Sequence, residues 1–229
     1  MKRKTNSSHQ DTVAAIALAL QGRNKGMFIT FEGGDGSGKT TQMQILADAL
    51  TDQRLELVTT REPGGTTLGG QLRDLIQHGQ HVSSKAETLM FAADRAQHVD
   101  ELIRPALVSG TTVLCDRYID SSVAYQGAAR GLGTGEVRDL SQWATGGLEP
   151  DLTILLDIEP RLGLRRATRH GADRIEQEGL DFQERVRQEY LHIATQNPGR
   201  TRVVDASGSI TSVSLAVAET VLNFVSVVR

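Results

Sequence analysis

The feature that most constrains the fold of this chain is the stretch "FITFEGGDGSGKTTQMQIL" at residues 28–46. An apolar, β-rich run meets "GGDGSG", a segment that neither a strand nor a helix accommodates well, and a helix-like run then begins at Lys39. The glycines allow a tight turn whose backbone amides point inward. A strand, a glycine turn and a helix in this order predict the first unit of a parallel α/β fold.

Apolar runs and helical patterns alternate along the rest of the chain. Stretches as long as those between the strands cannot be hairpins, so the chain must cross over between parallel strands. We therefore expect an α/β fold with a mostly parallel five-stranded sheet and helices on both faces. The expected strands are Met27–Glu32, Leu55–Thr60, Thr111–Asp116, Leu152–Asp157 and Arg202–Asp205, and the expected helices are 40–50, 67–78, 85–108, 120–145, 160–196 and 212–226.

Length and composition indicate one domain over residues 26–229, preceded by an extension of residues 1–25. The extension is either a poorly ordered appendage or a short helix between Asp11 and Gly22. The net charge of −3 gives no electrostatic reason to expect nucleic acid or an acidic membrane as a partner. A single cysteine, Cys115, fits a reducing cytoplasm. No run approaches the ~20 apolar residues that span a bilayer.

The glycine turn carries a phosphate-binding motif. Residues 33–40 read G-x-x-x-x-G-K-T, the P-loop pattern, in which backbone amides hold phosphate oxygens at a helix N-terminus. Lys39 can reach the β- and γ-phosphates, and the Thr40 hydroxyl can bind Mg²⁺. The motif predicts an ATP site formed by Gly33, Gly34, Asp35, Gly36, Ser37, Gly38, Lys39, Thr40 and Thr41.

Three classes of P-loop protein compete at this point: GTPases, motor or transport ATPases, and small-molecule kinases. The N-K-x-D guanine motif is missing, because the only "NK", Asn24–Lys25, lacks the Asp and precedes the first strand. Motor and transport ATPases are usually larger or repeated. A kinase needs a second pocket for the phosphate acceptor, and such a pocket should be rich in arginine.

Three segments supply that chemistry. "TTREPGGT" ends the second strand with Arg61, "MFAADRAQHV" places Phe91 and Arg95 on one helix face, and "CDRYIDSSVAYQG" follows the third strand with Asp116 and Arg117. Arginine binds phosphate in a bidentate manner and an aromatic face can stack on a base. Each feature also has a simpler interpretation, in which Phe91 belongs to the core and Arg95 forms a surface pair with Asp94.

Taken together, these motifs resemble those of bacterial thymidylate kinases. "FEGGDGSGKTTQ", "TREPGGT", "FAADRAQH", "DRYIDSSVAYQG", "PDLTILLD" and "DRIEQEGLDFQERVRQEYL" follow one another in the family's order between Met27 and Asp205. The resemblance implies a P-loop kinase fold with a mobile lid at about residues 166–179. It also implies transfer of the ATP γ-phosphate to dTMP, giving dTDP, by a cytoplasmic homodimer.

The resemblance further implies roles for residues around the phosphates. Asp35 is expected near the 3′-hydroxyl of dTMP and the transferring phosphate. Arg61 and Arg117 should bind the acceptor phosphate, while Asp116, with Thr40, should help to hold Mg²⁺. A general base is not required, because a dTMP phosphate oxygen is already anionic near neutral pH.

The same resemblance assigns the nucleoside pocket. Phe91 should stack on thymine and Arg95 should donate to its 4-carbonyl. Ser122 and Gln126 should line the base pocket, and Tyr125 should crowd the ribose 2′-position and so favour deoxyribose.

One position departs from part of the family. Some thymidylate kinases carry an arginine directly after the P-loop acid, where this chain has Gly36. The chain then resembles the branch that places its catalytic arginines in the lid, and Arg169 and Arg174 are the candidates, with Arg165 and Arg166 nearby. Such arginines contribute ~10³–10⁵ in rate in related phosphoryl-transfer systems.

Two other functions stay open on the sequence alone. The chain could phosphorylate a different acceptor, either another nucleoside monophosphate or a deoxynucleoside, or it could be a nucleotide-binding scaffold without turnover. Asp157 and His98 are interpreted as structural residues.

Overall fold

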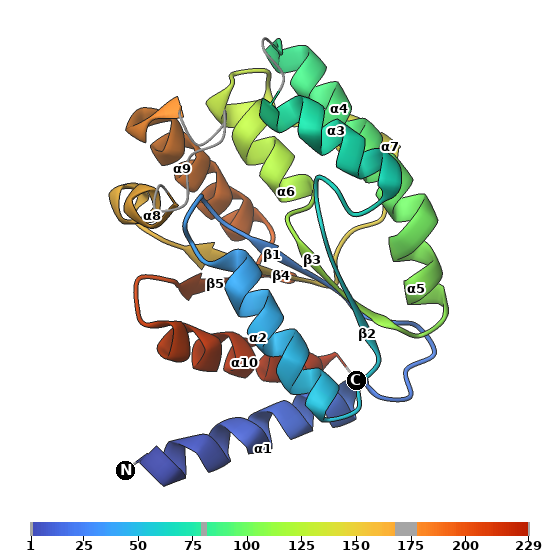
Figure 1. Cartoon of the computed structure of the whole chain (residues 1–229), viewed down its shortest axis with the longest axis vertical. Coiled ribbons are helices and arrows are strands. Elements are labelled where there is room, and N and C mark those ends of the chain that lie inside the picture. Colours follow the sequence, from blue (N-terminus) through green and yellow to red (C-terminus); the bar gives the residue numbers. More distant parts are fainter. Residues whose placement is uncertain (1, 79–81, 168–177, 229) are drawn as a thin grey trace.

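The computed structural model describes residues 2–78, 82–167 and 178–228, with no side-chain placement before His9. Its centre is a five-stranded sheet in the order β2-β3-β1-β4-β5, and every neighbouring pair is parallel. The expected α/β fold with a parallel sheet is therefore confirmed (Figure 1). The strands are β1 (Phe28–Glu32), β2 (Leu57–Arg61), β3 (Thr112–Asp116), β4 (Leu152–Asp157) and β5 (Thr201–Asp205).

The expected strand boundaries differ most at β2, which begins at Leu57 rather than at Leu55. The Leu55 amide donates to the Leu50 carbonyl at 3.2 Å, and Arg54 lies in the left-handed region with φ 61°. Leu55 therefore closes the end of the preceding helix and buries its side chain in the core before the strand starts.

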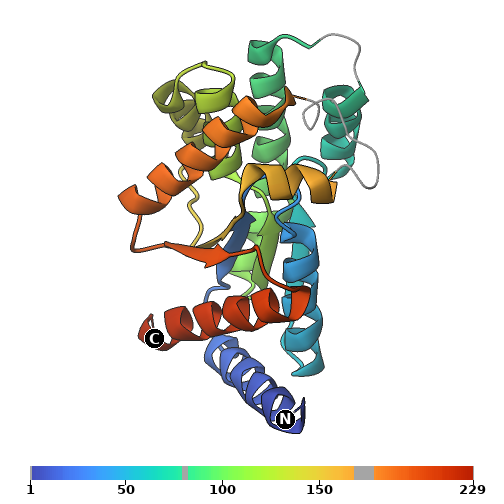
Figure 2. The same cartoon turned by 90° about the vertical axis from the view of Figure 1, so that its left-hand side faces the viewer.

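One face of the sheet is covered by α2 (Lys39–Asp52) and α10 (Ile210–Val227), with α1 (Lys2–Leu20) packed beneath α10 (Figures 1 and 2). Successive side chains of a strand point to opposite faces, so Ile29 and Phe31 of β1 belong to this core. The helices contribute mainly aliphatic side chains at helical spacing: Val13, Ile16, Ala17 and Leu20 from α1, Met43, Leu46, Ala47 and Leu50 from α2, and Val213, Val217, Val221 and Val225 from α10.

The opposite face receives the alternate strand residues, including Phe28, Val113 and Cys115. The helices of this side are α3 (Thr67–His78), α4 (Ser84–His98), η1 (Val99–Ile103), α5 (Arg104–Val108), α6 (Ile119–Ser122), η2 (Val123–Ala129), α7 (Thr134–Thr145) and α9 (Leu180–Gln196). α8 (Pro160–Ala167) follows β4, and its Leu162 packs against the core of the first face. The expected helix over 120–145 is interrupted between η2 and α7, because Gly131 and Gly133 adopt φ of 73° and 95°.

The N-terminal extension contains α1, which starts well before Asp11 and ends near Gly22. Its apolar residues from Val13 to Leu20 are part of the same core as α10. α10 is itself long and apolar enough, with a mean hydropathy of 1.6, to meet the length and composition of a membrane span, which the sequence analysis did not anticipate. Six of its side chains, from Val213 to Val225, are instead buried in the protein core.

The carboxyl ends of three neighbouring strands bring polar residues together. Asp116 at the end of β3 pairs in register with Arg61 of β2 and with Phe31 of β1, one residue before Glu32. In an open parallel sheet, ligands bind at this edge of the strands. The glycine turn after β1 lies at the same edge, so the fold places the predicted nucleotide and acceptor residues together.

Candidate active site

The glycine turn between β1 and α2 surrounds the amine of Lys39. Gly33, Gly36 and Gly38 all have positive φ, of 141°, 72° and 89°. This backbone places the Gly33 and Gly34 carbonyls where each accepts a hydrogen bond from Lys39 Nζ at 3.0 Å. Burial, followed by the charge of Arg117, lowers the pKa of Lys39 to about 8. An anionic phosphate beside the amine would favour its charged form again.

Asp35 of the same turn forms an ion pair with Arg117. Arg117 Nη2 lies 2.6 Å from Asp35 Oδ1, and Gln183 Nε2 donates to Asp35 Oδ2 at 2.8 Å. Burial acts to raise the pKa of Asp35, but Arg117 and Lys39 outweigh it and the pKa is lowered. Arg117 itself has φ 72°, an unusual value for a residue other than glycine, and its amide donates to the Phe31 carbonyl. This turn aims the guanidinium at the glycine loop.

Asp116 and Thr40 form the oxygen-rich part of the site. The Thr40 hydroxyl donates to Asp116 Oδ2, while Asp116 Oδ1 is buried with no hydrogen-bond partner among the described residues. A hydroxyl beside an unsatisfied carboxylate oxygen suits Mg²⁺, which prefers oxygen ligands and usually retains water. The donor set therefore fits the predicted metal.

A cavity of about 350 Å³ joins the two halves of the site. Its lining includes Asp35, Lys39, Thr40 and Asp116 from the nucleotide side. It also includes all seven residues predicted for the acceptor side, namely Arg61, Phe91, Arg95, Arg117, Ser122, Tyr125 and Gln126. Arg169 and Arg174 lie outside the described residues.

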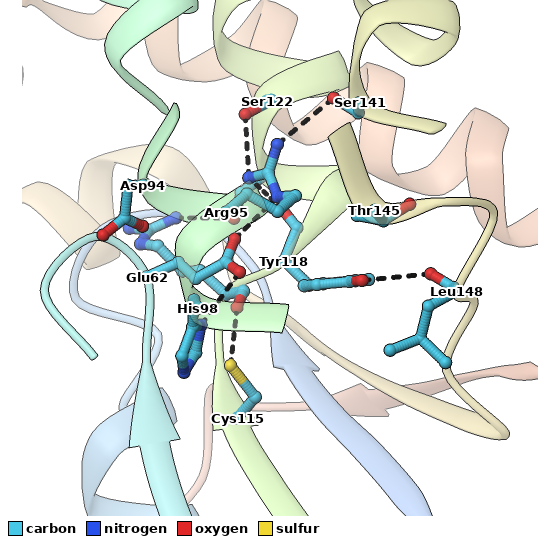
Figure 3. A network of polar contacts seen from close by, with 12 residues as sticks. Glu62, Asp94, Arg95, His98, Cys115, Tyr118, Ser122, Ser141, Thr145 and Leu148 are labelled. Atoms are coloured by element: carbon cyan, nitrogen blue, oxygen red, sulfur yellow. Dashed lines mark hydrogen bonds and ion pairs between the residues drawn. The ribbon is translucent and has the colours of Figure 1, made fainter. Parts of the chain in front are cut away.

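Arg95 occupies the centre of a buried polar network, drawn in Figure 3. Its guanidinium donates to Glu62 Oε2 at 2.7 Å, to Ser141 Oγ at 3.2 Å, and through Nη2 to the Tyr118 carbonyl and Ser122 Oγ, both at 3.1 Å. The alternative in which Arg95 forms a surface pair with Asp94 is therefore wrong. A guanidinium has five N–H groups, so these bonds leave one N–H on Nη1 without a partner among the described residues, and Arg95 lines the cavity.

Phe91, one turn before Arg95 on α4, is half-buried and lines the cavity rather than one of the core clusters. This position is compatible with stacking on a flat ligand. Tyr125 also lines the cavity but is buried, and its ring lies 5.0 Å from the Arg117 guanidinium.

Three buried acids that the sequence analysis did not single out organise these side chains. Glu32 accepts from the Tyr118 amide and the Ser121 hydroxyl at 2.8 and 2.6 Å, and burial raises its pKa to about 7. Glu62 pairs with Arg95 and His98, and Glu87 pairs with Arg130. The available signal was weak: Glu32 ends an otherwise mainly apolar strand, and Glu62 follows Arg61 directly.

The two residues interpreted as structural are both held by side chains. His98 Nδ1 lies 3.0 Å from Glu62 Oε1, and its Nε2 lies 2.7 Å from the Thr60 hydroxyl. Asp157 accepts two hydrogen bonds from Arg187, at 2.7 and 2.8 Å.

The glycine turn also contacts α8, the helix that leads into the predicted lid and overlaps its first two residues. A Cβ added to Gly36 would lie 2.0 Å from the Gly163 carbonyl oxygen, and one added to Gly163 would lie 2.5 Å from the Asp35 carbonyl oxygen. One turn further, Arg166 donates to the carbonyls of Ala206, Ser207 and Gly208. α8 is thus fixed between the glycine turn and the β5–α10 connection. Gly36 therefore has no space for a side chain.

We expect Gly36→Ala to lower both the melting temperature and turnover. The new Cβ would overlap the Gly163 backbone, and the φ of 72° is unfavourable for alanine. Strain of this kind costs about 1–3 kcal/mol. Thermal unfolding and steady-state kinetics measure the two effects. The matched control is Gly70→Ala on α3, where no atom lies within 4 Å of the new Cβ. Equal melting temperatures in the two variants would contradict the close contact.

Comparisons with known proteins agree on one family. A family model described as thymidylate kinase matches residues 31–217. A thymidylate kinase of Clavibacter sepedonicus is 53% identical over 184 residues, which are 79% of this chain and 87% of the relative. A thymidylate kinase of Bifidobacterium longum is 51% identical over 197 residues, or 84% and 95% of the two chains. The crystal structure of thymidylate kinase from Ehrlichia chaffeensis is 35% identical, with a TM-score of 0.72 over 86% of this chain and 98% of that one.

Proposed function

The chain belongs to the thymidylate kinase family, and from this premise we propose how its residues transfer the γ-phosphate of ATP to dTMP. It is an ATP-dependent nucleoside monophosphate kinase whose products are dTDP and ADP. The reaction is a step toward dTTP. The observation that carries the assignment of its site is the single cavity that joins the Lys39 loop to the arginine-rich acceptor residues.

On the donor side, the glycine turn would hold the ATP phosphates through its amides, with the Lys39 amine between the β- and γ-phosphates. The carbonyls of Gly33 and Gly34 already orient that amine. Thr40 and Asp116 would hold Mg²⁺, which when bound neutralises the negative charge on the phosphates.

On the acceptor side, Arg117 and Arg61 would bind the phosphate of dTMP. Both line the cavity, where Arg61 is exposed and Arg117 is paired with Asp35. Asp35 keeps Arg117 pointed at the glycine turn and would itself lie near the 3′-hydroxyl. Catalysis is then positioning and charge stabilisation, since the attacking phosphate oxygen is already anionic.

The nucleoside would occupy the rest of the cavity. Phe91 would stack on thymine, Arg95 would donate its remaining N–H to the 4-carbonyl, and Ser122 and Gln126 would complete the base pocket. Tyr125, held by Arg117 and by the ring of Phe182 at 6.0 Å, would crowd the 2′-position of the sugar.

We also place the chain in the branch with lid arginines, Arg169 first and Arg174 second. The support from the described residues is indirect: Gly36 is too close to Gly163 to carry a side chain, so the P-loop cannot supply that charge.

We further propose that the protein is a cytoplasmic homodimer. Neighbouring helices α3, α4 and α7 carry large exposed apolar side chains, with Leu75 56%, Leu89 58% and Trp143 81% exposed. Exposed apolar groups on adjacent helices are typical of a protein interface. Analytical ultracentrifugation of the full chain tests whether it forms a dimer.

An ADP-release assay with a panel of acceptors tests the function. We expect dTMP to be phosphorylated far faster than dGMP, dCMP or thymidine, because the acceptor pocket carries arginines for a phosphate and a donor for a 4-carbonyl. Faster turnover of thymidine would indicate a deoxynucleoside kinase, and binding of ATP and dTMP without ADP release would indicate a nucleotide-binding scaffold.

We expect Phe91→Ala to weaken dTMP binding by about 1–3 kcal/mol, the range for base–aromatic stacking. Isothermal titration calorimetry gives the dissociation constant. Lys85→Ala, at the exposed start of the same helix, is the control. Unchanged dTMP affinity in Phe91→Ala would assign Phe91 to packing alone.

A further inference from the structure

A buried acid that the mechanism above does not use lies next to the base pocket. Glu87 lies on α4 and is 0% exposed. Gln126 Nε2 donates to Glu87 Oε1 at 2.9 Å, and Arg130 donates to both carboxylate oxygens, at 3.2 and 3.3 Å. Because this buried carboxylate bonds to Gln126 of the cavity wall, it determines how the Gln126 amide is oriented.

The effect follows from donor and acceptor chemistry. An ionised carboxylate only accepts hydrogen bonds, whereas an amide has a donating nitrogen and an accepting oxygen. Glu87 therefore selects the nitrogen of Gln126 as its partner and turns the amide oxygen away. Among the described residues none donates to that oxygen, and Gln126 lines the cavity beside Arg95.

Arg130 pairs with the Glu87 carboxylate, and this pairing favours the ionised form that only accepts hydrogen bonds. A buried charge is costly unless it is paired, and the guanidinium of Arg130 supplies the pair. Arg130 is itself held in place, because it bonds to Glu178 and lies 5.1 Å from the ring of Phe182.

We propose that Glu87 is a specificity-determining positioning residue, which fixes Gln126 so that its amide oxygen accepts the N3–H of the acceptor base. This inference rests on the proposed dTMP site. Thymine and uracil present an N3–H donor beside a 4-carbonyl acceptor, which match the Gln126 oxygen and the Arg95 N–H. Cytosine presents the reverse pattern, an acceptor at N3 and a 4-amino donor, so both groups oppose it.

The experiment compares dissociation constants of dTMP, dUMP and dCMP for the wild-type chain and Glu87→Gln. A glutamine at position 87 can donate as well as accept, so the Gln126 amide is free to turn its nitrogen to the base. We expect the affinity for dCMP relative to dTMP to rise about tenfold, because the turned amide can form one hydrogen bond with cytosine and a bond of this kind contributes about that much. The ratio of dUMP to dTMP should not change, because these bases share N3–H and the 4-carbonyl.

The matched control is Glu101→Gln, since Glu101 accepts from Gln97 at 2.7 Å in an exposed pair of the same type. In Glu101→Gln, the affinities for dCMP and dUMP relative to dTMP should equal those of the wild type. Equal weakening of all three nucleotides by Glu87→Gln would show a merely structural role and would overturn the proposal.

Arg130 provides a second test if Glu87→Gln does not fold. Arg130→Gln removes a cation that is paired with the buried Glu87 carboxylate and so makes its charged form more costly. A protonated Glu87 can donate to the Gln126 oxygen, so the affinity for dCMP relative to dTMP should again rise. Arg130→Lys retains the charge and should keep the ratio near that of the wild type. An unchanged ratio in Arg130→Gln contradicts the proposal. A wild-type chain that does not prefer dTMP to dCMP contradicts the proposed function instead.

Discussion

Replacing Lys39 by alanine should reduce kcat by about 10²-fold or more, because it removes a charge aimed at the transferring phosphate. The amine is almost fully buried, with 7% of the residue exposed, and it bonds to two carbonyls of the glycine turn. Water therefore cannot easily replace it at the phosphates. Steady-state kinetics with saturating ATP and dTMP give the size of the loss.

Two further variants separate charge from packing. Lys39→Met retains most of the buried stem but not the charge, so it should lose as much activity as Lys39→Ala while keeping the melting temperature closer to wild type. Lys85→Ala, on the exposed start of α4, should behave like the wild type. Retention of more than about a tenth of the wild-type kcat by Lys39→Met would contradict the role of the charge, given the size of such electrostatic effects.

Replacing Arg117 by alanine should raise the KM for dTMP by about ten- to a hundredfold, the loss expected for a hydrogen bond to a charged group. The KM for ATP should change much less, because the glycine turn and Lys39 remain. The value of kcat should also fall, since Asp35 loses its partner at 2.6 Å and is then a poorly paired acid beside the reacting phosphates.

Arg117→Lys and Arg185→Ala complete this test. Lysine keeps the charge but loses the planar fork, so the KM for dTMP should recover only in part. Arg185 is exposed on α9, and its loss should leave both KM values unchanged. A larger effect of Arg117→Ala on ATP than on dTMP would reverse the division between donor and acceptor sides.

Local patterns predicted much of the architecture. Five short apolar runs separated by long helical stretches can only be parallel strands with crossovers, and the structure contains that sheet. The glycine turn could also be predicted from the sequence, because a left-handed backbone strongly prefers glycine and this short segment is rich in glycine. The function followed from the order of several motifs, and the comparisons confirm the family. The individual roles of the site residues stay predictions.

Contacts between segments that are distant in the sequence could not be predicted from it. Asp35 and Gln183 are 148 residues apart, yet they share a hydrogen bond. From the sequence, Gly36 was noted as a position where some thymidylate kinases carry an arginine. The structure adds that the Gly163 backbone lies so close that no side chain fits there. Only the packing of α8 on the glycine turn decides this.

The division has one physical cause. The sequence by itself determined what depends on neighbours along the chain: strand and helix periods, turn residues and the chemical types at the ends of strands. Tertiary structure alone decided the sheet order β2-β3-β1-β4-β5 and the partners of the buried acids Glu32, Glu62 and Glu87. A buried carboxylate must be paired, but its partner is whichever cation or donor the packing of distant helices brings within reach, and periodicity carries no information about that distance.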